Sequence, residues 1–518
     1  MILPVVLCIL DGWGVSPNTV GNAITQSHTP CFSGLWNDFP HTLLRASGAD
    51  VGLPAHQTGN SEAGHLNIGA GRIVEQDAVY ISRQITEGTF FTNPKLFSAV
   101  QHVKKHHSTL HLMGLLSNGQ SGHMIPEHLF ALLEFCSKHQ VSDVVLHLFT
   151  DGRDSPPRSA MQYVDDLEEA MHRWNVGRIG TLMGRHYAMD RAKIWERTLK
   201  AYNALTAGSN IVVQSAKDAI KRSYGLDVSD EYLEPTTIIS NGHEDSLIHD
   251  HDAVIFFNLR SDRARQITKA FVQSDFEDRH RIRERRQHVL SDVFFVAMTD
   301  FGPDLPSILT AFPSHDVKNS LPQVWSHLRQ LYVAESEKYA HITYFFNGGY
   351  QDAVGNEDRK MIPSLPVISF VQSPEMSARE ICDTAVDAIT SDRYDIVGMN
   401  FANADMVAHT GDIRATIQAV EFLDTQIQRL VDIVRESRGI LVLVGDHGNA
   451  EVMVNPMTGE INTHHDASLV PLILVGESVQ HIRLAENGVL GNVAPTLLSA
   501  MGCAVPNEMT CPSLILPT

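Results

Sequence analysis

The sequence predicts an α/β protein with largely parallel sheets, and two patterns support this prediction. Short apolar runs recur along the chain, each followed by a polar or glycine-containing turn; the clearest are residues 144–150, 252–258, 293–299, 395–401, 440–445 and 469–475. Segments with the apolar spacing of a helix, such as 128–138 and 415–435, separate many of these runs. Alternating strands and helices are typical of parallel sheets with crossover helices. In such sheets, ligands gather at the carboxyl ends of the strands.

Composition narrows the classes of protein to consider. The chain has 518 residues, too many for one ordinary hydrophobic core, so we expect two or three domains. The formal net charge of −20 disfavours a nucleic-acid partner, because no general positive charge is present to neutralise phosphates. An anionic small molecule would instead need a local group of arginines. The six cysteines show no CxxC spacing, which favours reduced thiols in a cytoplasmic protein.

The opening apolar run, residues 2–10, ends at Asp11 and is too short to span a membrane. It also lacks the basic leader and small-residue cleavage site of a signal peptide. We therefore expect a buried parallel strand here, and no membrane partner for the chain.

The distribution of residue types suggests a domain plan. Candidate metal ligands lie near the N-terminus and again after residue 400, whereas candidate anion-binding arginines lie between residues 150 and 265. If both groups of ligands serve one site, the middle of the chain must be an inserted domain. We expect a discontinuous domain of residues 1–76 and 310–518 and an inserted domain of residues 77–309. The linkers would be the region near Gln76 and the proline-rich stretch 302–313.

A D-x-x-x-H motif, Asp405 to His409, is the first candidate for metal binding. On a helix, positions i and i+4 share one face, but such a pair alone is more often an ordinary surface pair. Further ligand-type residues follow apolar runs or stand in polar loops: Asp11, Asp446, His447, His464 and His465. A mixture of aspartate and histidine suits divalent ions of borderline hardness, manganese or zinc in particular.

Most of the 27 histidines must have other roles. The cluster at residues 249–252 is expected to be a solvated loop that leads into a strand. The arginine-rich stretch 277–288 alternates with acidic residues and is expected to be a solvated helix.

Ser61 lies between two glycines in the stretch TGNSEAGH. A serine hydroxyl is a poor nucleophile until a base or a metal stabilises its alkoxide. From this octapeptide alone, Ser61 would be an N-cap or turn residue.

Three short motifs contain the arginines that an anionic substrate would need. They are DGRD at 151–154, GRHYAMDR at 184–191 and RSDRAR at 260–265, and each follows an apolar run. The planar fork of arginine donates two parallel hydrogen bonds to a carboxylate or phosphate. Each motif alone is as consistent with a salt-bridged loop as with a site. Three at strand ends within one segment favour anion binding.

Five blocks in one order carry a family resemblance: LDGWG at 10–14, GNSEAGHLNIGAGRIV at 59–74, DGRD at 151–154, NADMVAHTG at 403–411 and GDHGNAE at 445–451. Together they resemble the cofactor-independent phosphoglycerate mutases of the alkaline phosphatase superfamily. The resemblance extends to APTLL at 494–498. It implies an alkaline-phosphatase-like metal domain that is discontinuous, with an inserted α/β phosphotransferase domain.

The resemblance also implies two divalent ions, manganese first, with zinc or cobalt as alternatives. It assigns one ion to Asp405, His409 and His465, and the other to Asp11, Ser61, Asp446 and His447. His465 matches rather than its neighbour because HDASLVP keeps the family's distance to the following Val-Pro. The ion beside Ser61 would lower the pKa of its hydroxyl.

The substrate implied is phosphoglycerate, held by His123, Arg153, Arg185, Arg191, Arg260 and Arg263, with Asp154 near the reacting hydroxyls. Lys338 would reach the phosphate. Ser61 takes phosphate from 3-phosphoglycerate, and the 2-hydroxyl of the trapped glycerate recovers it. Asp154 is the candidate general base, and Lys338 assists the leaving oxygen. The resemblance further implies a cytoplasmic monomer that acts in glycolysis and gluconeogenesis.

The intermediate can be retained only if the active site closes, because a phosphoserine exposed to solvent would lose its phosphate to water. The two linkers are therefore predicted hinges. One substrate loop departs from the family pattern: in SNGQSGHM at 117–124 the histidine stands six residues after the serine, one more than in the usual SDGGVHSH, and the second histidine is lacking. Counting back from DGRD still places His123 at the substrate position.

Two alternatives remain at this stage. A phosphopentomutase, phosphomonoesterase or sulfatase would keep the metal set but leave the DGRD and DRARQ blocks unexplained. An inert metalloprotein with a binding role would be expected to have a broken ligand set, whereas all seven ligand positions are intact.

Overall fold

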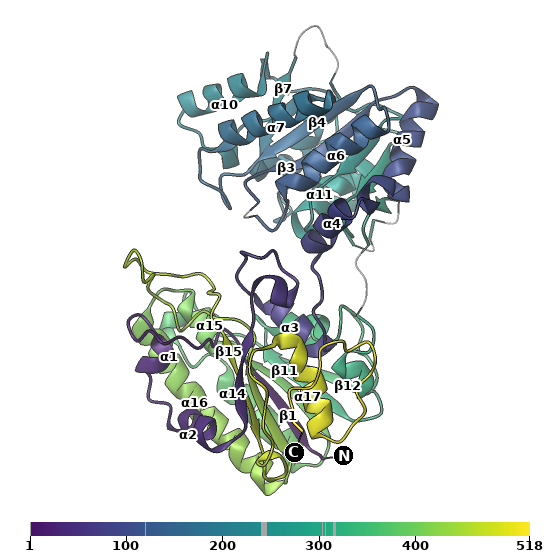
Figure 1. Cartoon of the computed structure of the whole chain (residues 1–518). Helices are drawn as coiled ribbons and strands as arrows, with labels where there is room; N and C mark the ends of the chain where they lie inside the picture. The colour runs from purple at the N-terminus through teal and green to yellow at the C-terminus, as the bar shows by residue number, and fades with distance from the viewer. Residues whose placement is uncertain are drawn as a thin grey trace. The chain divides into compact units, whose positions relative to one another are not determined.

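The computed structural model describes residues 2–119, 121–239, 246–302, 304–305, 307–313 and 317–517 (Figure 1). Its internal contacts divide the chain into two compact units, residues 1–76 with 315–518 and residues 77–314. The predicted α/β class is confirmed, because each unit is one eight-stranded sheet covered by helices. None of the described helices is long and apolar enough to cross a membrane.

The second limit between the units lies after residue 314, not after residue 309 as the proline-rich stretch suggested. The reason is that this stretch completes the inserted unit. Strand β10 (Leu309–Thr310) pairs with β9 (Phe294–Ala297) in the sheet of residues 77–314. Ala311 and Phe312, just beyond, are buried in the core of the same unit.

The sheet of the first unit has the order β12-β11-β13-β1-β14-β15-β2-β16. The five strands from β12 to β14 are parallel, and β15 is antiparallel to its neighbours. The strand bounds are β1 Val5–Leu10, β2 His41–Arg45, β11 Gln330–Glu335, β12 Glu357–Ile362, β13 Ile396–Phe401, β14 Ile440–Gly445, β15 Val470–Val475 and β16 Gly488–Val489.

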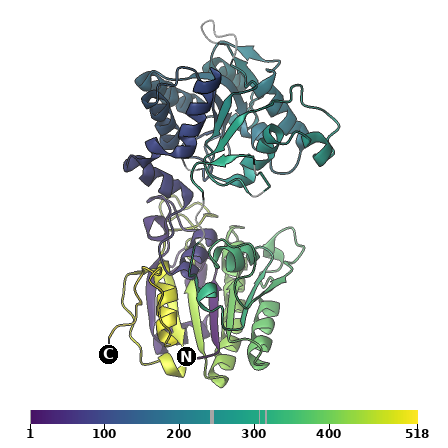
Figure 2. The same ribbon diagram turned by 90° about the vertical axis from the view of Figure 1, so that its right-hand side faces the viewer.

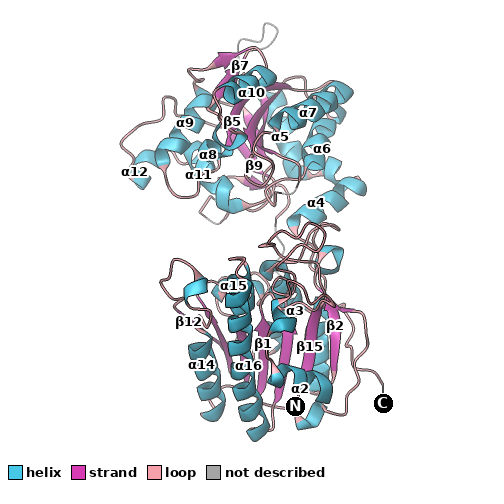
Figure 3. Cartoon of the chain, turned by 90° about the vertical axis from the view of Figure 1, so that its left-hand side faces the viewer, coloured by secondary structure: helices cyan, strands magenta, loops and turns pink. Residues whose placement is uncertain are grey.

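Strand β1 lies in the middle of this sheet and is buried on both faces, as its continuous apolar run predicts. Because side chains alternate across a strand, Val5, Leu7 and Ile9 join one core cluster, and the residues between them join another. Helices α14 and α16 pack on the second cluster and appear in front of the sheet in Figure 3. Helix α17 packs on the first and appears in front in Figure 2.

The helices of this unit connect and cover the strands. Their bounds are α1 Ala23–Gln26, α2 Pro30–Asp38, α3 Ser61–Ala70, α13 Leu321–Val324, α14 Ala378–Thr390, α15 Asn403–Ala408, α16 Ile413–Glu436 and α17 Val493–Ala500.

The sheet of the second unit has the order β10-β9-β8-β3-β4-β5-β7-β6, and only the β5–β7 pair is antiparallel. The remaining strand bounds are β3 Leu110–Leu116, β4 Val144–Thr150, β5 Arg178–Gly184, β6 Val212–Val213, β7 Thr236–Ile238 and β8 Ala253–Phe256. The order reverses beside β3, so right-handed crossovers place helices on both faces. Figure 3 shows α9 and α11 on the opposite side of this sheet to α6 and α7.

The helices of the second unit are α4 Asp77–Thr86, α5 Pro94–His106, α6 Pro126–Lys138, α7 Ala160–Trp174, α8 Arg185–Ala188, α9 Trp195–Thr206, α10 Ala216–Gly225, α11 Ser261–Val272 and α12 Phe276–His280.

Two sequence expectations for this unit need correction. The stretch 277–288 is not one solvated helix, because α12 ends at His280 and Arg281 takes a left-handed conformation with φ of 55°. Arg286 returns to form a buried ion pair with Glu277. In the cluster at 249–252, Asp252 is buried and accepts a hydrogen bond from the backbone amide of Thr109.

Candidate active site

The carboxyl ends of four neighbouring strands of the first unit bring the candidate catalytic residues together. Asp11 follows β1, Asp446 follows β14, Asp405 lies just beyond β13, and Lys338 lies just beyond β11. Gly12 has φ of 70°, and a Cβ there would lie 2.7 Å from the Cα of Asp405. Only glycine therefore lets the end of β1 approach α15 this closely.

Ser61 is the first residue of α3, and the side chain of Asn60 caps that helix. Ser61 is buried, and its Oγ donates to Asp11 Oδ1 at 3.1 Å. The same Oγ lies 3.0 Å from His447 Nε2 and accepts from Lys338 Nζ at 2.7 Å. The hydroxyl that the sequence singled out is therefore surrounded by a carboxylate, an imidazole and an ammonium group.

Asp405, His409 and His465 form one compact group of ligand-type side chains. The Nε2 atoms of both histidines lie 3.2 and 3.3 Å from Asp405 Oδ1. His409 Nδ1 donates to the carbonyl of Thr463 and His465 Nδ1 to that of Gly59, both at 2.8 Å. These bonds leave the Nε2 lone pairs free to converge, which is how histidine ligands of a metal are usually oriented.

Asp11, Asp446 and His447 form the second group, and all three are fully buried. Asp446 Oδ2 has no hydrogen-bond partner among the described residues. The nearby His65 Nδ1, 3.3 Å away, donates to the carbonyl of Ser61 instead. A buried carboxylate oxygen without a partner is costly unless a cation is bound. The donor set of this group therefore fits a divalent metal ion.

The charges of the two groups also favour a cation. Burial alone would lower the pKa of the Lys338 ammonium, but Asp11, Asp405 and Asp446 raise it above its ordinary value. Burial likewise opposes ionisation of Asp11, yet Lys338 and His447 hold its pKa well below the usual range. The same carboxylates overcome burial and raise the pKa of His447 to about 10. Each cationic group here is stabilised by an excess of buried carboxylates.

Three polar side chains that orient these groups were not predicted from the sequence. Asn400 donates to Asp11 Oδ2 at 2.8 Å, and Asn449 donates to Asp405 Oδ1 at 2.7 Å. His65 lies against both Ser61 and Asn400. His65 could have been predicted, because it stands four residues after Ser61 on a helix. For the two asparagines, the only signal in the sequence is that they lie in or just after apolar runs.

Of the adjacent histidines 464 and 465, only His465 lies in either group; His464 is exposed.

In the second unit, the three arginine motifs follow β4, β5 and β8. Arg185 is buried, and its Nη1 donates to Asp151 Oδ1 and to Asp154 Oδ2, each at 2.6 Å. Asp151, which the sequence analysis did not single out, also accepts from Ser117 Oγ at 2.6 Å. Arg191 donates to Asp262 at 2.7 Å. The strand ends thus bring the arginines and their aspartates into one region.

Burial lowers the pKa of Arg263, and the nearby charges of Arg185, Arg191 and Arg153 lower it further. Arg260 lies 3.5 Å from Asp262, and Arg153 lies 3.6 Å from Glu231. Such crowding of guanidinium groups is costly unless an anion binds among them.

His123 is buried, and its Nδ1 has no hydrogen-bond partner in the described part of the chain. Burial, with Arg185 and Arg260 nearby, lowers the pKa of His123 to about 4 despite the opposing charge of Asp262. The imidazole is therefore neutral near pH 7. Gln120, in the same loop, lies outside the described residues.

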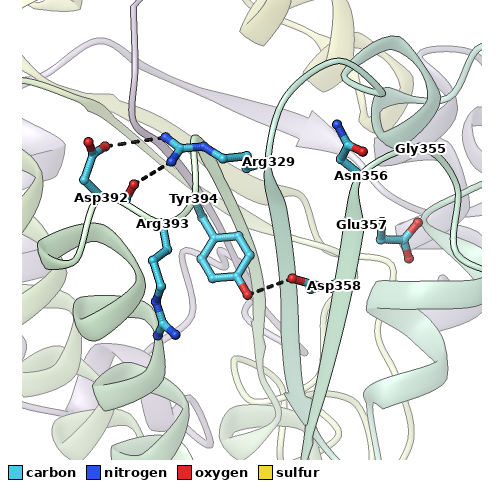
Figure 4. A pocket seen from close by; sticks show the side chains of 8 residues that line it. All are labelled: Arg329, Gly355, Asn356, Glu357, Asp358, Asp392, Arg393 and Tyr394. Carbon is cyan, nitrogen blue, oxygen red and sulfur yellow. Dashed lines mark hydrogen bonds and ion pairs between the residues drawn. The ribbon is translucent and has the colours of Figure 1, made fainter.

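A surface pocket lies at the amino edge of the first unit's sheet, before β11, β12 and β13 (Figure 4). Arg329 is paired there with Asp395, and the Tyr394 hydroxyl donates to Asp358 Oδ2. Because these polar groups are satisfied by each other and lie at the edge away from Ser61, the pocket is not part of the candidate active site.

Comparisons with known proteins place these residues in a family. Residues 81–303 match the model of the BPG-independent PGAM N-terminus. The chain is 46% identical to a 2,3-bisphosphoglycerate-independent phosphoglycerate mutase of Moorella thermoacetica, over 99% of this chain and 98% of that protein. It is 45% identical to the same enzyme of Clostridium perfringens, over 98% of each. This chain belongs to the 2,3-bisphosphoglycerate-independent phosphoglycerate mutase family.

A solved phosphoglycerate mutase of Leishmania mexicana, described at low cobalt concentration, has the same fold as this chain. Its TM-score is 0.74 at 29% identity, over 100% of this chain and 98% of that one. Membership of the phosphoglycerate mutase family favours the mutase over the phosphopentomutase and phosphomonoesterase alternatives. It also implies dependence on a divalent metal, which fits the two groups of aspartates and histidines.

Proposed function

We propose that this chain interconverts 3-phosphoglycerate and 2-phosphoglycerate through a phosphoserine on Ser61, without 2,3-bisphosphoglycerate. The main support is the position of Ser61 Oγ, within 3.1 Å of Asp11, His447 and Lys338. The crowded guanidiniums of the second unit support an anionic substrate, and Arg153, Arg185, Arg191, Arg260 and Arg263 with His123 would hold its carboxylate and phosphate.

We further propose two divalent ions, manganese first. Asp405, His409 and His465 would hold one, and Asp11, Ser61, Asp446 and His447 the other. When bound, the ions supply positive charge that stabilises the serine alkoxide and the phosphoryl oxygens.

In the first half-reaction, Ser61 Oγ gives up its proton and bonds to phosphorus, the bond from phosphorus to the 3-oxygen breaks, and the 3-oxygen takes up a proton to leave as the 3-hydroxyl of glycerate. Lys338 stabilises the negative charge on these oxygens through its ammonium group. In the second half-reaction, Asp154 takes the proton of the 2-hydroxyl, the 2-oxygen bonds to phosphorus, and the Ser61–phosphorus bond breaks. The Ser61 oxygen takes up a proton and Asp154 releases the one it accepted, which restores both groups. The arginines hold the glycerate in the site during the interval between the two half-reactions.

The test is conversion of 3-phosphoglycerate followed by phosphorus NMR, with manganese present and no bisphosphoglycerate. We expect conversion by the natural chain, and its loss with a chelator or in Ser61→Ala. Ser33→Ala removes an exposed serine of the same unit and should convert normally. Phosphate release without 2-phosphoglycerate would instead indicate a phosphatase.

The family resemblance also supports a cytoplasmic monomer that works in glycolysis and gluconeogenesis. Light scattering of the purified protein should give the mass of one chain, and a dimer mass would refute the monomer.

A further inference from the structure

Asp154 receives two hydrogen bonds on the same carboxylate oxygen. Arg185 Nη1 donates to Asp154 Oδ2 at 2.6 Å, and Ser121 Oγ donates to the same atom at 2.8 Å. Oδ1 has no donor among the residues that the structure describes. Two donors on one oxygen fix the rotation of a carboxylate and leave the other oxygen as the available proton acceptor.

Ser121 comes from a different strand end. It lies in the loop that follows β3, whereas Asp154 follows β4 and Arg185 follows β5. Ser121 is buried, and its Oγ accepts from the backbone amide of His123 at 3.3 Å. The Ser121 hydroxyl therefore connects the backbone of His123 to the carboxylate of Asp154.

The loop of Ser121 is also where this chain departs from the family pattern. The stretch SNGQSGHM replaces SDGGVHSH, so the hydroxyl at 121 belongs to the substituted segment.

We propose that Ser121 is a positioning residue that holds the Asp154 carboxylate with Oδ1 directed at the reacting hydroxyl of the substrate. This inference rests on the proposed function, in which Asp154 is the general base. Ser121 itself does not touch the reacting atoms.

The role of Ser121 can be measured through the pKa of Asp154, which the surrounding charges and hydrogen bonds determine. Burial raises the pKa of Asp154, but the hydrogen bond and charge of Arg185 and the hydrogen bond from Ser121 lower it overall. Asp151 shares the Arg185 guanidinium and is the other carboxylate of this group. Loss of the Ser121 hydroxyl removes one donor to the ionised form, so the pKa of Asp154 should rise. A general base must be deprotonated, so the acid limb of activity should move to higher pH.

The experiment compares the pH dependence of kcat/KM for the full chain, Ser121→Ala and Ser121→Thr, at saturating manganese. We expect the acid limb of kcat/KM to move up by about 0.5–1 pH unit in Ser121→Ala, so that activity at a fixed pH on that limb falls about 3- to 10-fold while KM changes less than about twofold. Ser121→Thr keeps the hydroxyl and should restore the natural profile. Ser159→Ala is the matched control, because the Ser159 hydroxyl bonds to the Pro156 carbonyl and not to Asp154.

A further variant, Asp154→Asn, separates this inference from the proposed function. If Asp154→Asn is inactive and the profile of Ser121→Ala is unchanged, Ser121 does not position the base. An equal loss of activity at every pH in Ser121→Ala that Ser121→Thr does not restore would also overturn the inference, because it indicates a purely structural role. If Asp154→Asn stays fully active, the assignment of the base in the proposed function is wrong.

Discussion

At the scale of single residues, the candidate site depends on hydrogen bonds that direct lone pairs. The Nδ1 atoms of His409 and His465 are both bound to backbone carbonyls, so the Nε2 atoms face Asp405. The neighbouring His464 has a similar sequence context but an exposed side chain. The orientation of the side chain, not its type, therefore separates a proposed ligand from its neighbour.

These two adjacent histidines provide a matched pair of variants. His465→Ala removes a proposed ligand and should weaken manganese binding by about 100-fold, because the remaining donors no longer complete the site. His464→Ala should leave binding unchanged. Calorimetric titration with manganese measures the affinity directly, and the rise in Tm at fixed manganese gives an independent reading. Equal affinities for the two variants would exclude His465 as a ligand.

At the scale of elements, the segment after α12 shows how a buried ion pair overrides a local pattern. Arg286 donates to both carboxylate oxygens of Glu277 and to the carbonyl of Ala270. Both charged side chains are almost fully buried. Alternating charges favoured a solvated helix at this place, but a helix cannot bring positions 277 and 286 into such contact. The chain turns at Arg281 instead.

Removing one partner of this pair should destabilise the second unit. Glu277→Gln leaves Arg286 buried without its counter-charge and should cost about 3 kcal/mol in urea-induced unfolding. Asp278→Asn removes the neighbouring, exposed ion pair with Arg285 and should have no measurable effect. Equal stability of the two variants would contradict the buried role of Glu277.

The same pair predicts how stability depends on pH. Burial opposes ionisation, but the hydrogen bonds from Arg286 lower the pKa of Glu277 to about 2, below its value in the unfolded chain. Its contribution is therefore fully present above the unfolded pKa, near 4.5, and is lost as the pH falls towards 2. Urea unfolding between pH 6 and pH 3 should be less pH-dependent in Glu277→Gln than in the natural chain.

At the scale of the whole molecule, the proposed reaction needs residues of both units. Each unit has its own sheet, and its candidate functional side chains lie at the carboxyl edge of that sheet. Ser61 and the metal groups belong to the first unit, whereas the arginines and Asp154 belong to the second. The segments that join the units are therefore proposed hinges.

Loosening one hinge should convert part of the mutase activity into phosphatase activity. Two glycines inserted after Gln76, before α4, should raise phosphate release relative to 2-phosphoglycerate formation by several-fold, because water reaches the phosphoserine more often. The same insertion after Thr458, in an exposed turn of the first unit, is the control. Both products can be followed by phosphorus NMR, and an unchanged product ratio would contradict the hinge.

Much of the fold and of the candidate site followed from local patterns. The apolar runs at 144–150 and 440–445 coincide with β4 and β14, because parallel strands buried on both faces carry continuous apolar residues. The expected limit after residue 309 lies five residues before the one that the contacts give, because the proline-rich stretch resembles a linker although residues 309–312 complete the sheet and core of the second unit. Asp151 and Ser121 were not identified because their roles depend on Arg185 and Asp154, which lie at other strand ends.

The sequence by itself determined the α/β class, the family and the types of side chain available for chemistry, since these depend on apolar periodicity and short motifs. Only the tertiary structure decided which of those side chains meet. Asp11, Ser61 and Asp446 are far apart along the chain, and they converge because β1 and β14 are neighbours and α3 begins beside their ends. Strand order within a sheet is set by long-range packing, and no spacing along the chain encodes it.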